Sequence, residues 1–417
     1  MTAIPKKLQY VLISIVFLTF FVISFITNIL NSIITDVRDS FELSLTATGF
    51  LPFSFFIAYG VMSVPAGFLA EKFREKSILI GSFLLVALAS MGFTLLPSYT
   101  TFLTTLFLLG CGMAVVQVVI NPLLRSAGGE ANFAFNSVIA QLVFGIASFT
   151  SPYVYQSIIA KDSHWFAEQL ITWLPVELSW VGLYVLFAFI TLVLVGIIWV
   201  VKFPVFEKAK NEKVGTVVNY FRILKNRTAL LFFAGIFSYV GIEQGIGNWI
   251  AAFLEQYHRI DPQLQGAEVV SFFWGMLTLG CLLGLLLLKF FGSKQVLIAF
   301  TSLTIFSLLL ALFGNRSVTL YAFPATGFFI SVMWSIIFSL GLNSVREHHG
   351  ALSGVLCTGI AGGAIIPLLI GWISEYASIR LGMLFMLIPL LYILSIGFWA
   401  KPIIKNKTIS LKNNRDI

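Results

Sequence analysis

The chain has 417 residues, of which 58% are hydrophobic and only 11% are charged, and its mean hydropathy is +0.95. This composition excludes an ordinary soluble domain and predicts a membrane protein that crosses the bilayer many times. The net charge of +8 requires no nucleic-acid partner, because basic loops that face anionic lipid account for it.

Twelve apolar runs follow one another along the sequence. Each has about 18 to 25 residues, enough to cross a hydrocarbon core of about 30 Å as a helix. The first is too long for a signal-peptide core and lacks a cleavage site, so we expect it to be retained. The runs are predicted to begin near Leu8, Thr46, Ser77, Thr101, Phe133, Leu178, Ala229, Val269, Val296, Thr319, Ala351 and Leu381. We therefore expect an all-α polytopic membrane protein.

The distribution of Lys and Arg predicts the orientation, because these residues accumulate in cytoplasmic loops. With the N-terminus inside, 21 of the 26 basic residues lie on the cytoplasmic side. Those left outside are Arg38, Lys161, Arg259, Arg316 and Arg380. We expect a multi-pass protein of the inner (plasma) membrane, with both termini in the cytoplasm.

A polar stretch from Lys202 to Arg227 separates the sixth run from the seventh. It divides the chain into a six-helix bundle at residues 1–200, a cytoplasmic linker at 201–228, a second six-helix bundle at 229–402 and a cytoplasmic tail at 403–417. Two bundles around a site near the middle of the membrane are the architecture of many transporters. Each chain supplies both halves of such a pathway, so we expect it to function as a monomer.

The sequence gives little support to an enzyme. Its three cysteines fall within predicted spans at unrelated positions, and its four histidines lie in loops or at helix ends. An enzyme would need a nucleophile, a metal set or an acid pair at one depth. We expect no disulfide, no resident metal and no cofactor other than a coupling ion, H⁺ or Na⁺.

Glu243 is the only acidic residue deep inside an apolar run, in the stretch SYVGIEQGIGNWI. A charged side chain at the bilayer centre costs roughly 2.5 to 3.5 kcal/mol on insertion scales, so such residues usually mark an ion or substrate path. Gly241, Gly245 and Gly247 interrupt the same helix and allow it to bend. We expect Glu243 to be the cation-coupling group. The alternative is a protonated Glu that is hydrogen-bonded within the helix bundle.

Polar and aromatic side chains of other runs complete a candidate substrate site. Amides three or four residues apart share a helix face, and tryptophan rings suit the apolar face of a sugar. The alternatives are interhelical hydrogen bonds for the amides and core packing for the rings. The candidate substrate-binding residues are Asn28, Asn31, Gln117, Asn121, Gln141, Gln244, Asn248, Trp249, Trp274 and Trp334.

Several strings resemble known families. PAGFLAEKFREKS, from Pro65 to Ser77, resembles the signature loop of the major facilitator superfamily, although Phe73 and Glu75 disturb its spacing. That resemblance implies a conformational latch formed by three residues, which are Glu71, Lys72 and Arg74.

The strings ITNILNSII, QVVINPLL, SYVGIEQGIGNWI and WSIIFSLGLNSV resemble the fucose, galactose and glucose permease family of that superfamily, as does the stretch from Gly350 to Glu375. The resemblance spans both halves of the chain. It implies the major facilitator fold and sugar uptake coupled to a cation by alternating access.

The sequence also departs from the L-fucose permeases. Those proteins carry an acid where this chain has Ser32, a Glu where it has Gln117, and an Asn at the position of Leu142. These departures argue against fucose itself. Glu243 resembles the acidic seventh-helix position of family members similar to glucose or galactose transporters.

The sequence therefore predicts a secondary symporter for a neutral hexose or a related sugar, with the proton favoured as the coupling ion. A sodium-coupled symporter is the alternative, in which Glu243 and Asn248 would hold the ion. A polyspecific drug/proton efflux antiporter is the alternative from a different class.

Overall fold

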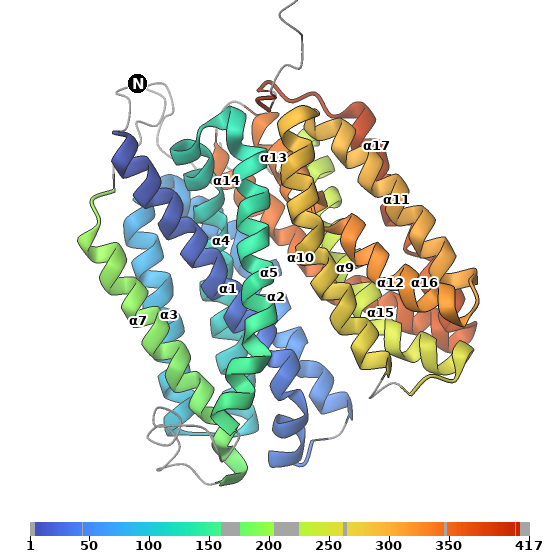
Figure 1. The fold of residues 1–417 in the computed structure, drawn as a ribbon. Coiled ribbons are helices and arrows are strands. Elements are labelled where there is room, and N and C mark those ends of the chain that lie inside the picture. Colours follow the sequence, from blue (N-terminus) through green and yellow to red (C-terminus); the bar gives the residue numbers. More distant parts are fainter. Residues whose placement is uncertain are drawn as a thin grey trace, which may run out of the picture.

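The computed structural model describes residues 5–43, 45–159, 176–203, 225–261, 265–345, 348–404 and 406–408. In these residues it has 12 helical segments that are long and apolar enough to cross a membrane. Each lies on one of the predicted spans, within a few residues of its expected start. The predicted fold class is confirmed, and Figure 1 shows the helices arranged in two bundles side by side.

Among its described residues, the first half of the chain has six long helices and two short 3₁₀ segments, η1 (Glu130–Asn132) and η2 (Val176–Val181). Ser98 caps the start of the fourth long helix, because its hydroxyl accepts a hydrogen bond from the Thr101 amide at 3.2 Å. The long helices are α1 (Lys6–Ser40), α2 (Leu45–Lys72), α3 (Glu75–Leu95), α4 (Tyr99–Gly128), α5 (Phe133–Ile159) and α7 (Gly182–Val200).

Where the structure describes it, the second half has three unbroken spanning helices and three that are divided into segments. The unbroken ones are α9 (Arg227–His258), α10 (Ala267–Phe290) and α11 (Ser293–Phe313). The tenth span consists of α12 (Arg316–Ile330) and α13 (Met333–Asn343), and the eleventh of α14 (His349–Thr358), η4 (Gly359–Ala361) and α15 (Gly362–Tyr376). The twelfth consists of α16 (Ile379–Leu384) and α17 (Leu387–Trp399).

The glycines of the seventh span do not divide the helix into segments, since α9 is continuous. Instead, side chains of neighbouring helices pack against its glycines. A Cβ at Gly245 would lie 2.9 Å from Ile370 Cδ1, and one at Gly247 would lie 3.1 Å from the Trp274 ring. The glycine pattern therefore reflects close packing against α15 and α10.

A matching pair of lysines reveals that the two halves repeat one another. Lys76, at the start of α3, donates to two carbonyl oxygens at the end of α7, at 2.6 and 2.9 Å. Lys294, at the start of α11, donates in the same way at the end of α17, at 3.0 and 2.8 Å. Each cation satisfies carbonyls that have no partner within their own helix. The third and sixth helices of each half are thus joined identically.

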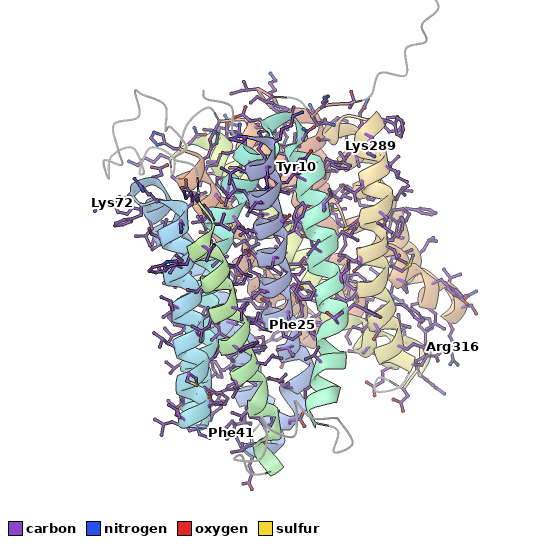
Figure 2. The ribbon with its side chains drawn as sticks, turned by 60° about the vertical axis from the view of Figure 1, so that its left-hand side comes forward. Tyr10, Phe25, Phe41, Lys72, Lys289 and Arg316 are labelled. Atoms are coloured by element: carbon purple, nitrogen blue, oxygen red, sulfur yellow. The ribbon has the colours of Figure 1, made fainter. Side chains whose placement is uncertain are left out.

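The ends of the helices define two faces. Tyr10, Lys72 and Lys289 lie near the end where α1 begins, which we call the terminus face, while Phe41 and Arg316 lie near the opposite face (Figure 2). Residues 204–224 of the predicted linker and 409–417 of the predicted tail lie outside the described residues.

Close contacts between the halves occur where α2 packs against α14. A Cβ at Gly354 would lie 2.6 Å from the Ser63 carbonyl oxygen and 3.0 Å from the Gly67 Cα. Ser353 adds a hydrogen bond to the Val118 carbonyl of α4, at 2.7 Å. Small residues allow helix backbones to approach closely in membranes. The two bundles are therefore in direct backbone contact at this position.

Candidate functional site

Glu243 lies midway along α9 and is half-buried. Its carboxyl accepts a hydrogen bond of 2.8 Å from the Tyr239 hydroxyl, one helical turn earlier, and the Gln244 amide also reaches it. Cys281 of α10 lies near this cluster, with its thiol directed to the Leu277 and Ser331 carbonyls. In the part of the chain that the structure describes, no Lys or Arg pairs with Glu243. The carboxyl therefore has hydrogen-bond donors but no neutralising charge.

Three further candidates offer polar or aromatic surface. Among the described residues, none of them makes a hydrogen bond to another side chain. Trp274 of α10 is half-buried, with its ring against Gly247. Gln117 of α4 and Gln141 of α5 are both 7% exposed. These groups retain hydrogen-bonding capacity or ring surface for a small ligand.

Asn121 is fully buried in α4. Its amide nitrogen donates to the Gln117 carbonyl at 2.7 Å, while its Oδ1 has no partner within the described structure. An unpaired buried oxygen is costly. Asn121 thus retains one unused acceptor next to Gln117.

Other candidates connect helices to one another. The Asn28 amide donates to Ser148 Oγ at 2.9 Å and so joins α1 to α5. Gln244 is half-buried and packs on Gly363. The Asn31 side chain lies outside the described side chains.

Two of the predicted tryptophans make well-defined packing contacts. Trp249 donates from Nε1 to the Pro367 carbonyl at 3.2 Å, which ties α9 to α15. Trp334 is 5% exposed and stacks on Phe338, with a centroid separation of 4.7 Å. Asn248, by contrast, is exposed. The two tryptophans thus have packing roles in this structure, and the assignment of all three residues to the substrate site stays a prediction.

Glu71 of the predicted latch contacts the second half of the chain. Its Oε1 accepts a hydrogen bond from the Ala351 amide at 3.2 Å and lies 3.3 Å from His348 Nδ1. A carboxylate beside the first amides of α14 is favourable because that helix end carries partial positive charge. Lys72 lies over the Phe73 ring of its own half, and Arg74 is exposed at the start of α3.

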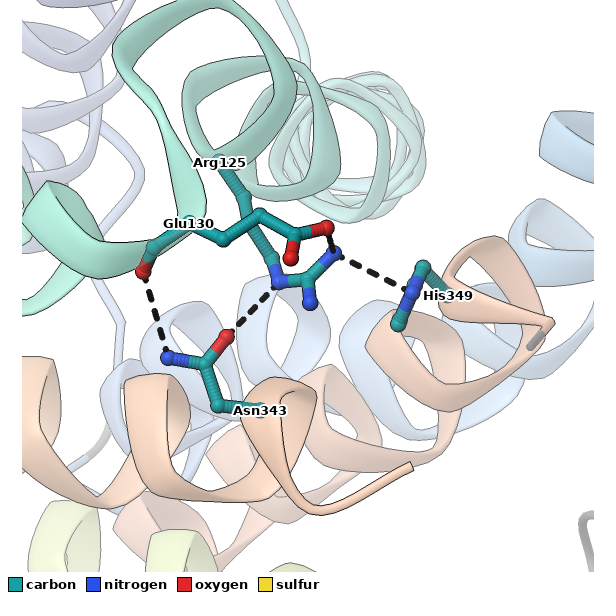
Figure 3. Close-up of polar contacts among 4 residues, drawn as sticks. All are labelled: Arg125, Glu130, Asn343 and His349. Atoms are coloured by element: carbon teal, nitrogen blue, oxygen red, sulfur yellow. Dashed lines mark hydrogen bonds and ion pairs between the residues drawn. The ribbon is translucent and has the colours of Figure 1, made fainter. Parts of the chain in front are cut away.

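A second connection between the halves, which the sequence did not predict, centres on Arg125 of α4 (Figure 3). Its Nε donates to Asn343 Oδ1 at 2.8 Å, and its Nη1 lies 3.1 Å from His349 Nε2. Glu130 pairs with the same guanidinium at 2.9 Å. We call Arg125, Glu130, Asn343 and His349 the gate cluster. It lies at the terminus face, between α4 and the connection from α13 to α14.

The gate cluster determines the protonation of His349. A guanidinium only donates hydrogen bonds, so His349 Nε2 must accept, and the ring is neutral with its proton on Nδ1. That Nδ1 has no partner among the described atoms. Protonation of His349 would place a second cation against Arg125 and weaken the connection between the halves.

The segment after α17 also reaches both halves at this face. The Ile403 amide donates to the Asn343 carbonyl, and the Lys407 amide donates to the Ala131 carbonyl, each at 2.8 Å. Asn406 accepts from the Ser293 amide at 2.9 Å. The end of the described chain is thus anchored on the second half and touches η1 of the first.

Comparison with known proteins identifies this architecture. Residues 16–259 match the family model of the Major Facilitator Superfamily. The chain belongs to the Major Facilitator Superfamily. Members compared with it are transporters, and the chain is a transporter rather than an enzyme.

Relatives cover nearly the whole chain. A glucose/galactose transporter of Brucella abortus is 28% identical over 413 residues, which are 95% of each protein. An L-fucose-proton symporter of Escherichia coli is 24% identical over 388 residues, 86% of each protein. A glucose/mannose transporter of Bacillus subtilis is 23% identical over 382 residues, 88% of each.

Solved structures show the same fold. The major facilitator transporter FucP in its outward conformation superposes with a TM-score of 0.81 at 20% identity, covering 93% of this chain and 98% of FucP. The proton:xylose symporter XylE superposes with a TM-score of 0.71 at 12% identity, covering 95% and 97%. The two-bundle arrangement of this superfamily member is therefore that of known transporters.

Proposed function

We propose that this superfamily member takes up a neutral hexose or related sugar by cation symport, through alternating access between its two bundles. Relatives named as glucose/galactose and glucose/mannose transporters support the substrate class. The observation that carries the coupling is the half-buried Glu243 carboxyl, which lies in mid-span without a basic partner among the described residues. A membrane-embedded acid of this kind marks an ion path.

The proposed substrate site includes, besides that carboxyl, polar and aromatic groups of α4, α5 and α10. Trp274 supplies a ring surface, and Gln117 and Gln141 supply amides that donate to and accept from sugar hydroxyls. No described Lys or Arg pairs with Glu243. A neutral sugar fits this surface better than an anionic one.

The proton is the proposed coupling ion. Protonation neutralises Glu243 and removes the cost of holding a charge within the membrane, so proton loading and closure around a sugar favour the same state. Sodium would need several converging oxygens. Asn248 lies five residues from Glu243, about 140° around the helix at about 100° per residue, and is exposed. The two side chains therefore point in different directions.

The proposed orientation places both termini in the cytoplasm of a plasma-membrane protein embedded in lipid. The terminus face is then the cytoplasmic face. Its closure by Glu71 and the gate cluster corresponds to an outward-facing state, in keeping with the superposition on FucP in the outward conformation. One chain contains both bundles and functions as a monomer.

The test is transport by purified protein in proteoliposomes. Counterflow and gradient-driven uptake are measured with labelled glucose, galactose, mannose, N-acetylglucosamine and fucose, under imposed pH or sodium gradients. Accumulation of a hexose with an inward proton gradient supports the proposal. Accumulation with a sodium gradient alone would show that sodium, and not the proton, is the coupling ion. Export of lipophilic cations without any sugar signal would overturn the sugar assignment.

A further inference from the structure

We propose that Tyr239 is a positioning residue that keeps the Glu243 carboxyl able to release its proton, and thereby sets the pH range of transport. This inference rests on the proposed proton coupling. Tyr239 and Glu243 lie four residues apart on α9, so their side chains share one helix face. The hydroxyl lies 2.8 Å from Glu243 Oε1.

The burial of Tyr239 makes this contact significant. Its side chain is only 1% exposed, so water does not serve its hydroxyl, and Glu243 is its described hydrogen-bond partner. The carboxyl itself belongs to a half-buried residue, so it is less enclosed than the hydroxyl. The pair thus joins a hydroxyl enclosed in the protein to a carboxyl that is only partly enclosed.

Other groups near the pair are few. Cys281 of α10 lies near it, but its thiol points to the Leu277 and Ser331 carbonyls, at 3.5 and 3.7 Å. Gln244 of α9 supplies an amide. From α12 through α17, the described residues bring no charged group to the carboxyl. Tyr239 is therefore the buried hydroxyl on which the charged carboxylate depends.

The hydroxyl affects the two protonation states unequally. A hydrogen bond to an ionised acceptor is roughly twice as strong as a neutral one, so Tyr239 favours the carboxylate over the carboxylic acid. Without Tyr239 the acid would hold its proton to higher pH and release it less readily on the cytoplasmic side.

The experiment compares Tyr239→Phe with wild type and with Tyr392→Phe. Tyr392 is the matched control, because its hydroxyl donates to the Leu231 carbonyl of the same helix at 2.7 Å, far from the carboxyl. The pH dependence of galactose uptake driven by a proton gradient is measured between pH 5.5 and 9, with counterflow at each pH. We expect Tyr239→Phe to raise the pH midpoint of uptake by about one unit, corresponding to about 1.4 kcal/mol. Tyr392→Phe is expected to leave the midpoint unchanged.

A second variant tests the same bond from the other side. Glu243→Asp withdraws the carboxyl from the Tyr239 hydroxyl but retains the acid. Aspartic acid is intrinsically the stronger acid by about 0.4 pH units, so shortening alone would lower the midpoint. An upward shift in Glu243→Asp therefore reports the lost hydrogen bond, even if Tyr239→Phe does not fold.

The possible failures are distinguishable. If wild type shows no proton-driven uptake, or Glu243→Gln accumulates sugar as wild type does, then the proposed function is wrong. If wild type and Glu243→Gln behave as proposed, but the midpoint of Tyr239→Phe equals that of Tyr392→Phe, then the positioning role is wrong. A downward or absent shift in Glu243→Asp would overturn it equally.

Discussion

Replacing Arg125 with leucine should open the terminus face. Arg125 makes two hydrogen bonds across the halves, to Asn343 at 2.8 Å and to His349 at 3.1 Å. Bonds from a charged donor are worth about 1.5 to 3 kcal/mol each. We take the lower value for both, because the partners can regain water once the face opens. The loss of about 3 kcal/mol shifts the ratio of closed to open states about 100-fold, at 1.4 kcal/mol per tenfold.

The assay is a spin-label distance measurement across the terminus face. Labels replace Phe73 and Phe291, which are exposed on the two halves. Arg125→Leu should move the distance distribution to longer values, at the expense of the short distance of wild type. Glu130→Gln is the control, because the 43% exposed Glu130 side chain pairs with Arg125 within one half and contributes little. A wild-type distribution in Arg125→Leu would refute the gate.

Three further predictions concern other contacts. Gly354→Val should shift the same label distance to longer values, because a Cβ there lies 2.6 Å from a backbone oxygen that cannot move aside. Trp249→Phe should lower the unfolding temperature, because it loses a hydrogen bond worth about 1 kcal/mol, and it should leave the KM of counterflow unchanged. Trp274→Phe, by contrast, should raise that KM. Asn406→Ala should speed hydrogen exchange of the Ser293 amide, while unaltered exchange would show that the segment is not anchored there.

The fold followed from composition and periodicity because the bilayer imposes strict lengths. Apolar runs such as those starting near Leu8 and Ser77 admit few structures other than spanning helices. The seventh span shows the limit of this reasoning. Gly241, Gly245 and Gly247 predict a helix that can bend, but neither sequence nor periodicity reveals which side chains of other helices pack against them.

The gate cluster could not be predicted from local sequence patterns. Arg125 and His349 lie 224 residues apart, and nothing in either local sequence specifies the other. One usable signal is present, since Arg125 is the only basic residue near the connection between the fourth and fifth spans. Glu243 could be identified because an acid within an apolar run is unusual by itself. Its partner Tyr239 could not, because a tyrosine in such a run is ordinary.

The central claim is that one membrane-embedded carboxyl couples the ion to the sugar. The most direct measurement compares wild type and Glu243→Gln in the same proteoliposomes, by proton-driven accumulation and by counterflow of the transported hexose. The account predicts that Glu243→Gln loses accumulation and retains counterflow, because the neutral amide occupies the carboxyl's place but carries no exchangeable charge. Full accumulation by Glu243→Gln would contradict it.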